Sequence, residues 1–271
     1  MRSHTLIAAG LLAGVIGCTD KAGDTAGDTD TTFVIGFEVR GTIENIEDGA
    51  TTADNLCIDL IDPTSKVFEG GDLLILDSTQ VTAEGTFVFT GVTTSSSVGL
   101  LMLADDCDGG DQYMGLATGI PSDTVNALDY GDVLEGQVLY FVEQEVINGY
   151  NTDLALAGYT GAGIQVDGSI MGWVIDGIEL ETAGPVDCAQ VVPYSDETEC
   201  YYADGDTSDG LFTTGGAPNT ETDLSGGGFY VCTPAPIGTY TASDCNGSEY
   251  YEILGGSVDG LAQWVRIPKF E

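Results

Sequence analysis

The sequence has a single histidine and only six basic residues in a chain of 271. The histidine is His4, so the remainder lacks the imidazole that Ser-His-Asp catalysis, Cys-His catalysis and His-containing zinc sites require. The 44 acidic residues give a formal net charge of −38, which repels nucleic acid and anionic lipid headgroups. We therefore exclude a nucleic-acid partner and predict that the protein is not an enzyme.

The first apolar run covers residues 6–17, follows Arg2 and is too short to span a bilayer. A basic start, a short apolar run and a small final residue are typical of a secretory signal. The ending Val15-Ile16-Gly17-Cys18 resembles the lipobox of bacterial lipoproteins. The resemblance implies cleavage before Cys18 and acylation of that cysteine with palmitate-type chains, which would make the membrane a partner. Thr19, where an Asp would favour inner-membrane retention, implies the outer membrane.

Residues 18–32 contain the near-repeat Ala-Gly-Asp-Thr and no large apolar side chain. Such a segment cannot recover its ordering entropy by burial, so it predicts a disordered acidic tether. The predicted organisation is a signal peptide over 1–17, the tether over 18–32, one β-domain over 33–113, a connector over 114–168 and a second β-domain over 169–271.

Two parts of the chain align when they are anchored on cysteine. Gly41-Thr42-Ile43 precedes Cys57 as Gly172-Trp173-Val174 precedes Cys188, and Ala104-Asp105-Asp106-Cys107 matches Ala242-Ser243-Asp244-Cys245. Ordered matches of this kind indicate two copies of one fold. Apolar runs bounded by turn residues predict the following strands in the two copies: 37–43, 56–61, 73–76, 86–89, 99–104, 169–175, 189–192, 200–203, 228–232, 238–242 and 262–267.

The second copy also resembles carboxypeptidase regulatory-like domains. It carries Gly172-Trp173-Val174, a Pro185-Val186 start, a Thr222-Asp223 start and Pro236-Ile237-Gly238-Thr239-Tyr240, in the order in which that family shows such motifs. The first copy lacks the last of them. The resemblance implies a prealbumin-like β-sandwich that serves as an accessory module. The predicted fold is therefore all-β, with two tandem prealbumin-like antiparallel β-sandwich domains and a short helical connector.

Seven cysteines become six if Cys18 is lipidated, an even number suited to an oxidising compartment. The repeat predicts equivalent bridges Cys57–Cys107 and Cys188–Cys245, which leaves Cys200–Cys232. Counting alone allows three pairings of the four cysteines in the second copy.

The connector carries one helical pattern. Its apolar residues are spaced by three or four, as on one face of a helix, and Gly158 is a suitable end. These residues are Val142, Val146, Tyr150, Leu154 and Ala157. We expect one helix that packs on a sandwich.

Alternating acids in the loop Asp204-Gly205-Asp206-Thr207-Ser208-Asp209 could supply oxygen ligands to Ca²⁺. The EF-hand pattern is broken there, because Asp209 stands where glycine is required. A second acidic cluster comprises Asp105, Asp106, Asp108 and Asp111. In a chain this rich in aspartate, both clusters also arise from composition alone.

The main functional hypothesis is a membrane-anchored surface lipoprotein, a structural or adhesion-type module with a protein or glycan partner. The alternative is a carbohydrate-binding lipoprotein that stacks sugars on exposed aromatics of the second domain. The aromatic candidates are Trp173, Trp264, Tyr201, Tyr202, Tyr250 and Tyr251. Partial burial in strands is the competing interpretation of these side chains.

Overall fold

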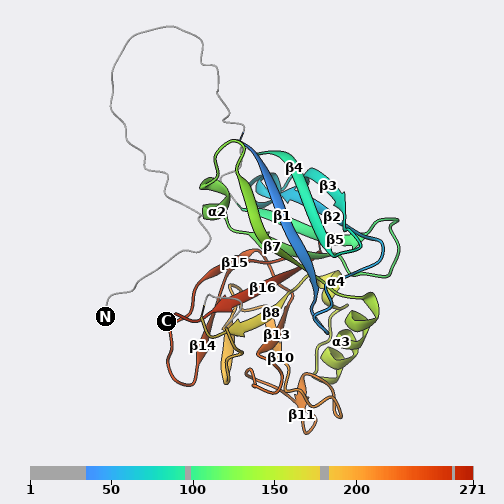
Figure 1. The fold of residues 1–271 in the computed structure, drawn as a ribbon. Coiled ribbons are helices and arrows are strands. Elements are labelled where there is room, and N and C mark those ends of the chain that lie inside the picture. The colour runs from blue at the N-terminus through green and yellow to red at the C-terminus, as the bar shows by residue number, and fades with distance from the viewer. Residues whose placement is uncertain (1–34, 95–98, 178–182, 258–259, 271) are drawn as a thin grey trace, which may run out of the picture.

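The computed structural model describes residues 35–94, 99–177, 183–257 and 260–270. Strands account for 45% of the chain and helices for 12%, so the protein is all-β as predicted. Two β-sandwiches lie one above the other in Figure 1, the first in blue and green and the second in yellow to red. Cys18, the tether and the signal lie outside the described residues. No helix in the described part is long and apolar enough to cross a membrane.

The first sandwich packs two sheets around one apolar core. One sheet has the order β4-β1-β7, and the other has the order β6-β5-β2-β3. The strands are β1 (Ile35–Asn45), β2 (Leu56–Asp62), β3 (Leu74–Gln80), β4 (Thr86–Thr94), β5 (Leu100–Asp106), β6 (Leu116–Ile120) and β7 (Val133–Phe141). Phe87 and Phe89 of β4 are buried while Val88 between them is exposed, the alternation expected of a strand that faces the core on one side.

The second sandwich repeats this arrangement. One of its sheets has the order β10-β13-β8-β16, and the other has the order β15-β14-β9. The strands are β8 (Ile170–Ile175), β9 (Ala189–Val192), β10 (Glu199–Tyr202), β13 (Phe229–Thr233), β14 (Gly238–Asp244), β15 (Ile253–Gly255) and β16 (Ala262–Pro268). A two-stranded ribbon, β11 (Thr213–Thr214) and β12 (Ala217–Pro218), extends from its lower end.

The aligned sequence segments occupy equivalent places in the two sandwiches. Strands β1 and β8 each lie between an antiparallel strand, β4 or β13, and a parallel strand, β7 or β16. Strand β2 pairs with β5 as β9 pairs with β14. One sheet of each sandwich is thus mixed, because the last strand of each copy returns parallel to the first. The sequence had predicted purely antiparallel sheets.

The three disulfides are Cys57–Cys107, Cys188–Cys245 and Cys200–Cys232. The first two occupy equivalent sites, each at the end of the pair β2/β5 or β9/β14. The third joins directly opposed residues of β10 and β13. The pairing derived from the repeat is the pairing in the structure.

The segment 114–168 contributes more than the helix expected of it. Strands β6 and β7 both belong to the first sandwich, although we predicted no strand there. Only the end of β7 is buried, and Gly136 inside it has a positive φ, so the strand has no regular apolar pattern. The helices of the structure are α1 (Thr64–Glu69), α2 (Ser122–Asn126), α3 (Gln144–Leu156) and α4 (Ile164–Asp167).

Helix α3 is the predicted helix, and it covers the outer face of the second sandwich's main sheet. Ile147 and Leu154 are buried in a core that also contains Phe212, Phe229 and Trp264. The opposite face of the same sheet packs on β9, β14 and β15. Strand β13 is therefore buried along its whole length, because its alternate side chains enter two different cores.

The two sandwiches share one sheet. Strand β16 of the second sandwich pairs in parallel with β6 of the first, through Ala262–Leu116, Gln263–Ala117 and Trp264–Thr118. This pairing, which we call the seam, makes a continuous eight-stranded sheet of order β10-β13-β8-β16-β6-β5-β2-β3. The tandem sandwiches are thus fused edge to edge.

We predict that the Cys57–Cys107 bridge stabilises the first sandwich. The double variant Cys57→Ser/Cys107→Ser should lower the free energy of unfolding by about 2–4 kcal/mol, because the bridge closes a loop between residues 50 apart in sequence. Chemical denaturation under non-reducing conditions measures the change. An unchanged denaturation midpoint would show that the bridge contributes nothing to stability.

The repeated glycines Gly41 and Gly172 are expected to tolerate no side chain. A Cβ on Gly172 would lie 1.7 Å from the Val265 carbonyl oxygen, and one on Gly41 would lie 2.1 Å from that of Gln137. Gly172→Ala should destabilise the protein by about 1–3 kcal/mol through this overlap. Gly149→Ala is the control, since a Cβ there meets nothing within 4 Å and helix α3 favours alanine. Equal thermal stability of the two variants would contradict the close-approach explanation.

Candidate functional site: an apolar cavity at the seam

A cavity of about 470 Å³ opens where the seam strands diverge. Strands β6 and β16 pair over three residues, and beyond Thr118 and Trp264 they separate. The gap is bounded by β7 from the far sheet of the first sandwich and by β15 from the far sheet of the second. A volume of 300–1,000 Å³ is usual for small-molecule sites.

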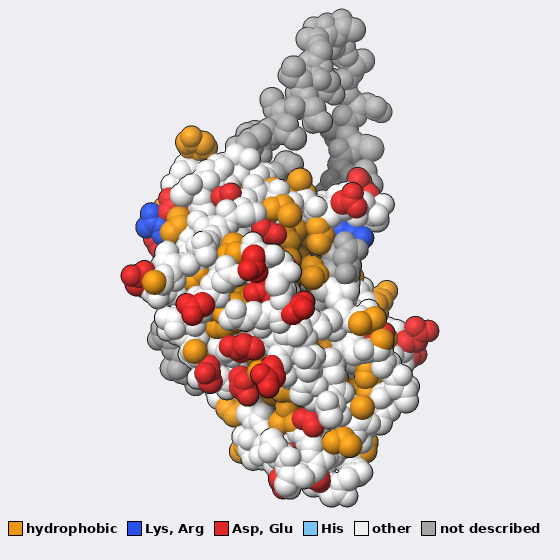
Figure 2. Space-filling view, turned by 90° about the vertical axis from the view of Figure 1, so that its right-hand side faces the viewer, with side chains coloured by type: hydrophobic (Ala, Val, Ile, Leu, Met, Phe, Trp, Pro, Cys, Tyr) orange, Lys and Arg blue, Asp and Glu red, His pale blue; other side chains and the backbone are white. Residues whose placement is uncertain are grey.

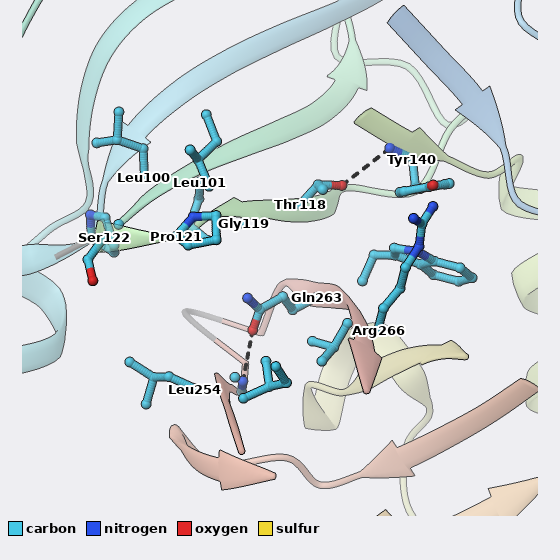
Figure 3. Close-up of a pocket in the computed structure, with 18 of the residues that line it drawn as sticks. Leu100, Leu101, Thr118, Gly119, Pro121, Ser122, Tyr140, Leu254, Gln263 and Arg266 are labelled. Atoms are coloured by element: carbon cyan, nitrogen blue, oxygen red, sulfur yellow. Dashed lines mark hydrogen bonds between the residues drawn. The ribbon is translucent and has the colours of Figure 1, made fainter. Parts of the chain in front are cut away.

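The wall of this cavity is mainly aliphatic. Its lining includes Leu100, Leu101, Ile120, Val138, Ile237 and Leu254. Figure 3 shows Leu100 and Leu101 above the gap and Leu254 below it. An apolar wall of this composition favours the hydrocarbon part of a ligand, because burial there removes apolar surface from water.

Besides Ser122, Gln137 and Tyr140, three polar side chains interrupt the apolar wall. Gln263 accepts a hydrogen bond from the Gly256 amide at 2.9 Å through Oε1, which leaves its Nε2 as a donor. Thr118 accepts one from the Tyr140 amide at 3.2 Å, which leaves its hydroxyl hydrogen as a donor. The third is Arg266 at the end of the cavity beside Tyr140 (Figure 3). These three side chains all offer N–H or O–H donors.

Arg266 is held by aromatic rings. Its guanidinium carbon lies 4.6 Å from the centre of the Tyr140 ring and 5.5 Å from that of Trp173. Its Nε is buried without a hydrogen-bond partner. Burial lowers the pKa of the guanidinium, while the charge of Glu44 acts in the opposite direction. Cation–π contacts of about 0.5–2 kcal/mol do not replace the hydrogen bond that the buried Nε–H lacks.

No carboxylate of the described residues forms an ion pair with Arg266. The exposed Arg40, by contrast, pairs with Glu38 and Glu135. A cation without an acidic partner is unusual in a chain of net charge −38, whose acidic side chains spread across the face in Figure 2. Sequence reasoning missed this site because β6 and β15, which form its walls, carry no strong strand pattern. The one available signal was the scarcity of basic residues.

The predicted calcium loop does not assemble a metal site. Asp204 accepts hydrogen bonds from the Asp206 amide and the Thr214 hydroxyl, Asp206 accepts one from the Ser208 amide, and Asp209 accepts one from the Gly216 amide. The loop thus uses its own carboxylates to hold its turns. Over the described residues, no group of three or more acidic, cysteine or histidine side chains is placed to hold a metal ion.

The second acidic cluster has a structural role beside its disulfide. Asp106 directly precedes Cys107 in sequence. It accepts hydrogen bonds from the amides of Gln112 and Tyr113. Asp244, the matching residue before Cys245, accepts them from the amides of Asn246 and Ser248. In both copies this aspartate fastens the turn that follows the bridging cysteine.

The proposed sugar platform does not exist as predicted. Trp264, Tyr201, Tyr202 and Tyr250 are at most 6% exposed, so they cannot stack on a ligand at the surface. Trp173 and Tyr251 are partly buried, and Tyr251 packs on Phe270 at 3.9 Å between ring centres. The four buried aromatic side chains belong to the apolar cores on the two faces of the main sheet.

No family model matches the chain, and no curated protein matches it. Solved structures with some similarity include the Bacillus anthracis TIE protein, at 11% identity and a TM-score of 0.27, over 88% of this chain and 35% of that one. The shaft pilin SpaA from Lactobacillus rhamnosus GG gives 11% identity and a TM-score of 0.23, over 87% and 98%. The minor pilin GBS52 from Streptococcus agalactiae gives 9% and 0.22, over 87% and 97%. Scores this low support no argument about function.

Calcium is not expected to stabilise this protein, because no three acidic side chains among the described residues are placed to hold a metal ion together. The melting temperature should be the same in excess calcium and in excess chelator, measured by differential scanning calorimetry. Asp206→Asn serves as a matched variant whose melting temperature should be equally insensitive to calcium. A calcium-dependent rise in the wild-type protein that Asp206→Asn abolishes would contradict this interpretation.

Proposed function

We propose that this protein is an exported lipoprotein whose Cys18 carries the lipid that anchors a non-enzymatic, disulfide-stabilised surface module. The observation that carries the proposal is the use of the seven cysteines. Six of them form three disulfides in the structure, and the seventh ends the lipobox-like sequence. Disulfides persist in oxidising compartments outside the cytoplasm.

The charge and the surface of the module are consistent with a structural or adhesion-type protein that is exposed to water. A net charge of −38 keeps the body soluble and away from anionic headgroups, so the lipid and the tether would provide its attachment to the membrane. Large apolar side chains are exposed at one end of the first sandwich, at Phe68, Leu74 and Ile75. Exposed apolar side chains of this size are available for contact with a protein or glycan partner.

The outer membrane is the proposed location, on the basis of Thr19 after the lipidated cysteine. Catalysis is not part of the proposal, because the sole histidine of the chain is His4, in the segment that export would remove. The function proposed is to present the fused sandwiches at the cell envelope.

Cys18→Ser should release the protein from membranes into the soluble exported fraction, because serine has no thiol to acylate. Cell fractionation followed by immunoblotting measures the distribution. The control is Cys57→Ser/Cys107→Ser, which removes cysteines from the body and leaves the anchor, so this variant should stay with the outer membrane. Retention of Cys18→Ser in the outer membrane would refute lipid anchoring at this residue.

A further inference from the structure

We propose that the seam cavity binds a small amphiphilic monocarboxylate, with its hydrocarbon chain against the aliphatic wall and its carboxylate on Arg266. The proposal goes beyond display at the envelope and stands independently of the lipid anchor. It rests on a cavity of about 470 Å³ with an aliphatic lining and on a cation at one end that lacks an acidic partner among the described residues.

The chemistry of the head group follows from the donors in the wall. The guanidinium presents N–H groups in a planar fork that matches a carboxylate. Gln263 Nε2 and the Thr118 hydroxyl are further donors elsewhere along the wall. A cationic head group would meet repulsion from Arg266. A neutral alcohol would leave the charge without a partner, so the carboxylate is the head group that satisfies the site best.

The chemistry of the tail follows from the shape of the gap. The lining includes glycines beside the branched aliphatic residues, among them Gly119 of β6 and Gly255 of β15. A Cβ on Gly119 would lie 3.6 Å from Gln263 Nε2, an ordinary contact, so the absence of a side chain there leaves the space open. A flexible aliphatic chain can fill a space of this kind without polar partners.

Two electrostatic effects disfavour an anion at this site: the negative net charge of the chain and the carboxylate of Glu44. Neither outweighs the attraction of Arg266. The net charge of the chain repels anions in general, but at physiological ionic strength screening limits this repulsion to about 8 Å. Glu44 acts on Arg266 electrostatically, yet it forms no ion pair with it. A bound carboxylate would contact the guanidinium directly, where the attraction between opposite charges is strongest.

Both tryptophans of the protein report on this site. Trp264 lines the cavity, and the centre of its ring is 4.6 Å from that of Trp173, the ring over which Arg266 lies. A ligand that enters the cavity should therefore change the intrinsic tryptophan fluorescence. No label is needed to follow binding.

The test titrates the full chain, carrying Cys18→Ser so that it is free of acyl groups, with decanoate below its micelle-forming concentration. Decanol and decyltrimethylammonium are the matched neutral and cationic probes. We expect a saturable fluorescence change, with decanoate bound at least about tenfold more tightly than decanol, as is usual for a hydrogen bond to a charged group. The cationic probe should bind most weakly. The absence of saturable binding, or equal affinity for all three probes, would overturn the proposal. This outcome requires no substitution in the cavity.

Variants then assign the binding to the cavity. Arg266→Gln should remove the preference for decanoate over decanol, and Arg266→Lys should retain part of it. Gly119→Leu should abolish binding of both, because its side chain fills the gap while leaving Arg266 in place. Arg40→Gln removes an exposed arginine of the first sandwich. Its affinities for decanoate and decanol should equal those of the protein without a cavity substitution. Folding of each variant is checked by circular dichroism. A decanoate preference that survives Arg266→Gln, or binding that survives Gly119→Leu, would overturn the assignment.

Discussion

The parallel pairing of β6 with β16 is the interaction on which the architecture depends. Three residue pairs join the sheet β6-β5-β2-β3 of the first sandwich to the sheet β10-β13-β8-β16 of the second. Without them each sandwich would expose a strand edge, and an exposed edge invites pairing with other chains. The seam also explains the cavity, because the strands that meet over these residues diverge immediately afterwards.

The repeat supplies the parts that the seam joins. In each copy a glycine of the first strand admits the close approach of a parallel strand, at Gly41 beside Gln137 and at Gly172 beside Val265. In each copy a disulfide and an aspartate secure the end of the other sheet. The copies differ in one strand: β3 of the first copy pairs with β2, whereas β10 of the second copy joins the other sheet, where Cys200–Cys232 holds it against β13. Helix α3 then covers the outer face of the enlarged sheet.

Sequence reasoning located the elements that have regular patterns. All eleven predicted strands, the helix α3 and the three disulfides are present, because apolar runs, cysteine spacing and turn residues each leave a local signal. The ribbon strands β11 and β12 were missed, as were β6, β7 and β15. Strand β6 is short and contains Gly119, and β7 is buried only toward Phe141, so neither shows the alternation of a half-buried strand. The seam and the cavity are built from these strands and could not be predicted. The acidic loop at Asp204 was misleading for the opposite reason: aspartates that hold turns resemble aspartates that hold a metal.

The seam implies that the two sandwiches form a single folded body. Hydrogen exchange followed by mass spectrometry tests it most directly, through peptides that cover 116–120 and 262–268. Amides that exchange only through global unfolding belong to the cooperative core, whereas amides in weakly held segments exchange through local opening. We expect the seam peptides to be as protected as those from β8, in the core of the second sandwich. Seam peptides that exchange as fast as surface loops would show two separately folded sandwiches and contradict it.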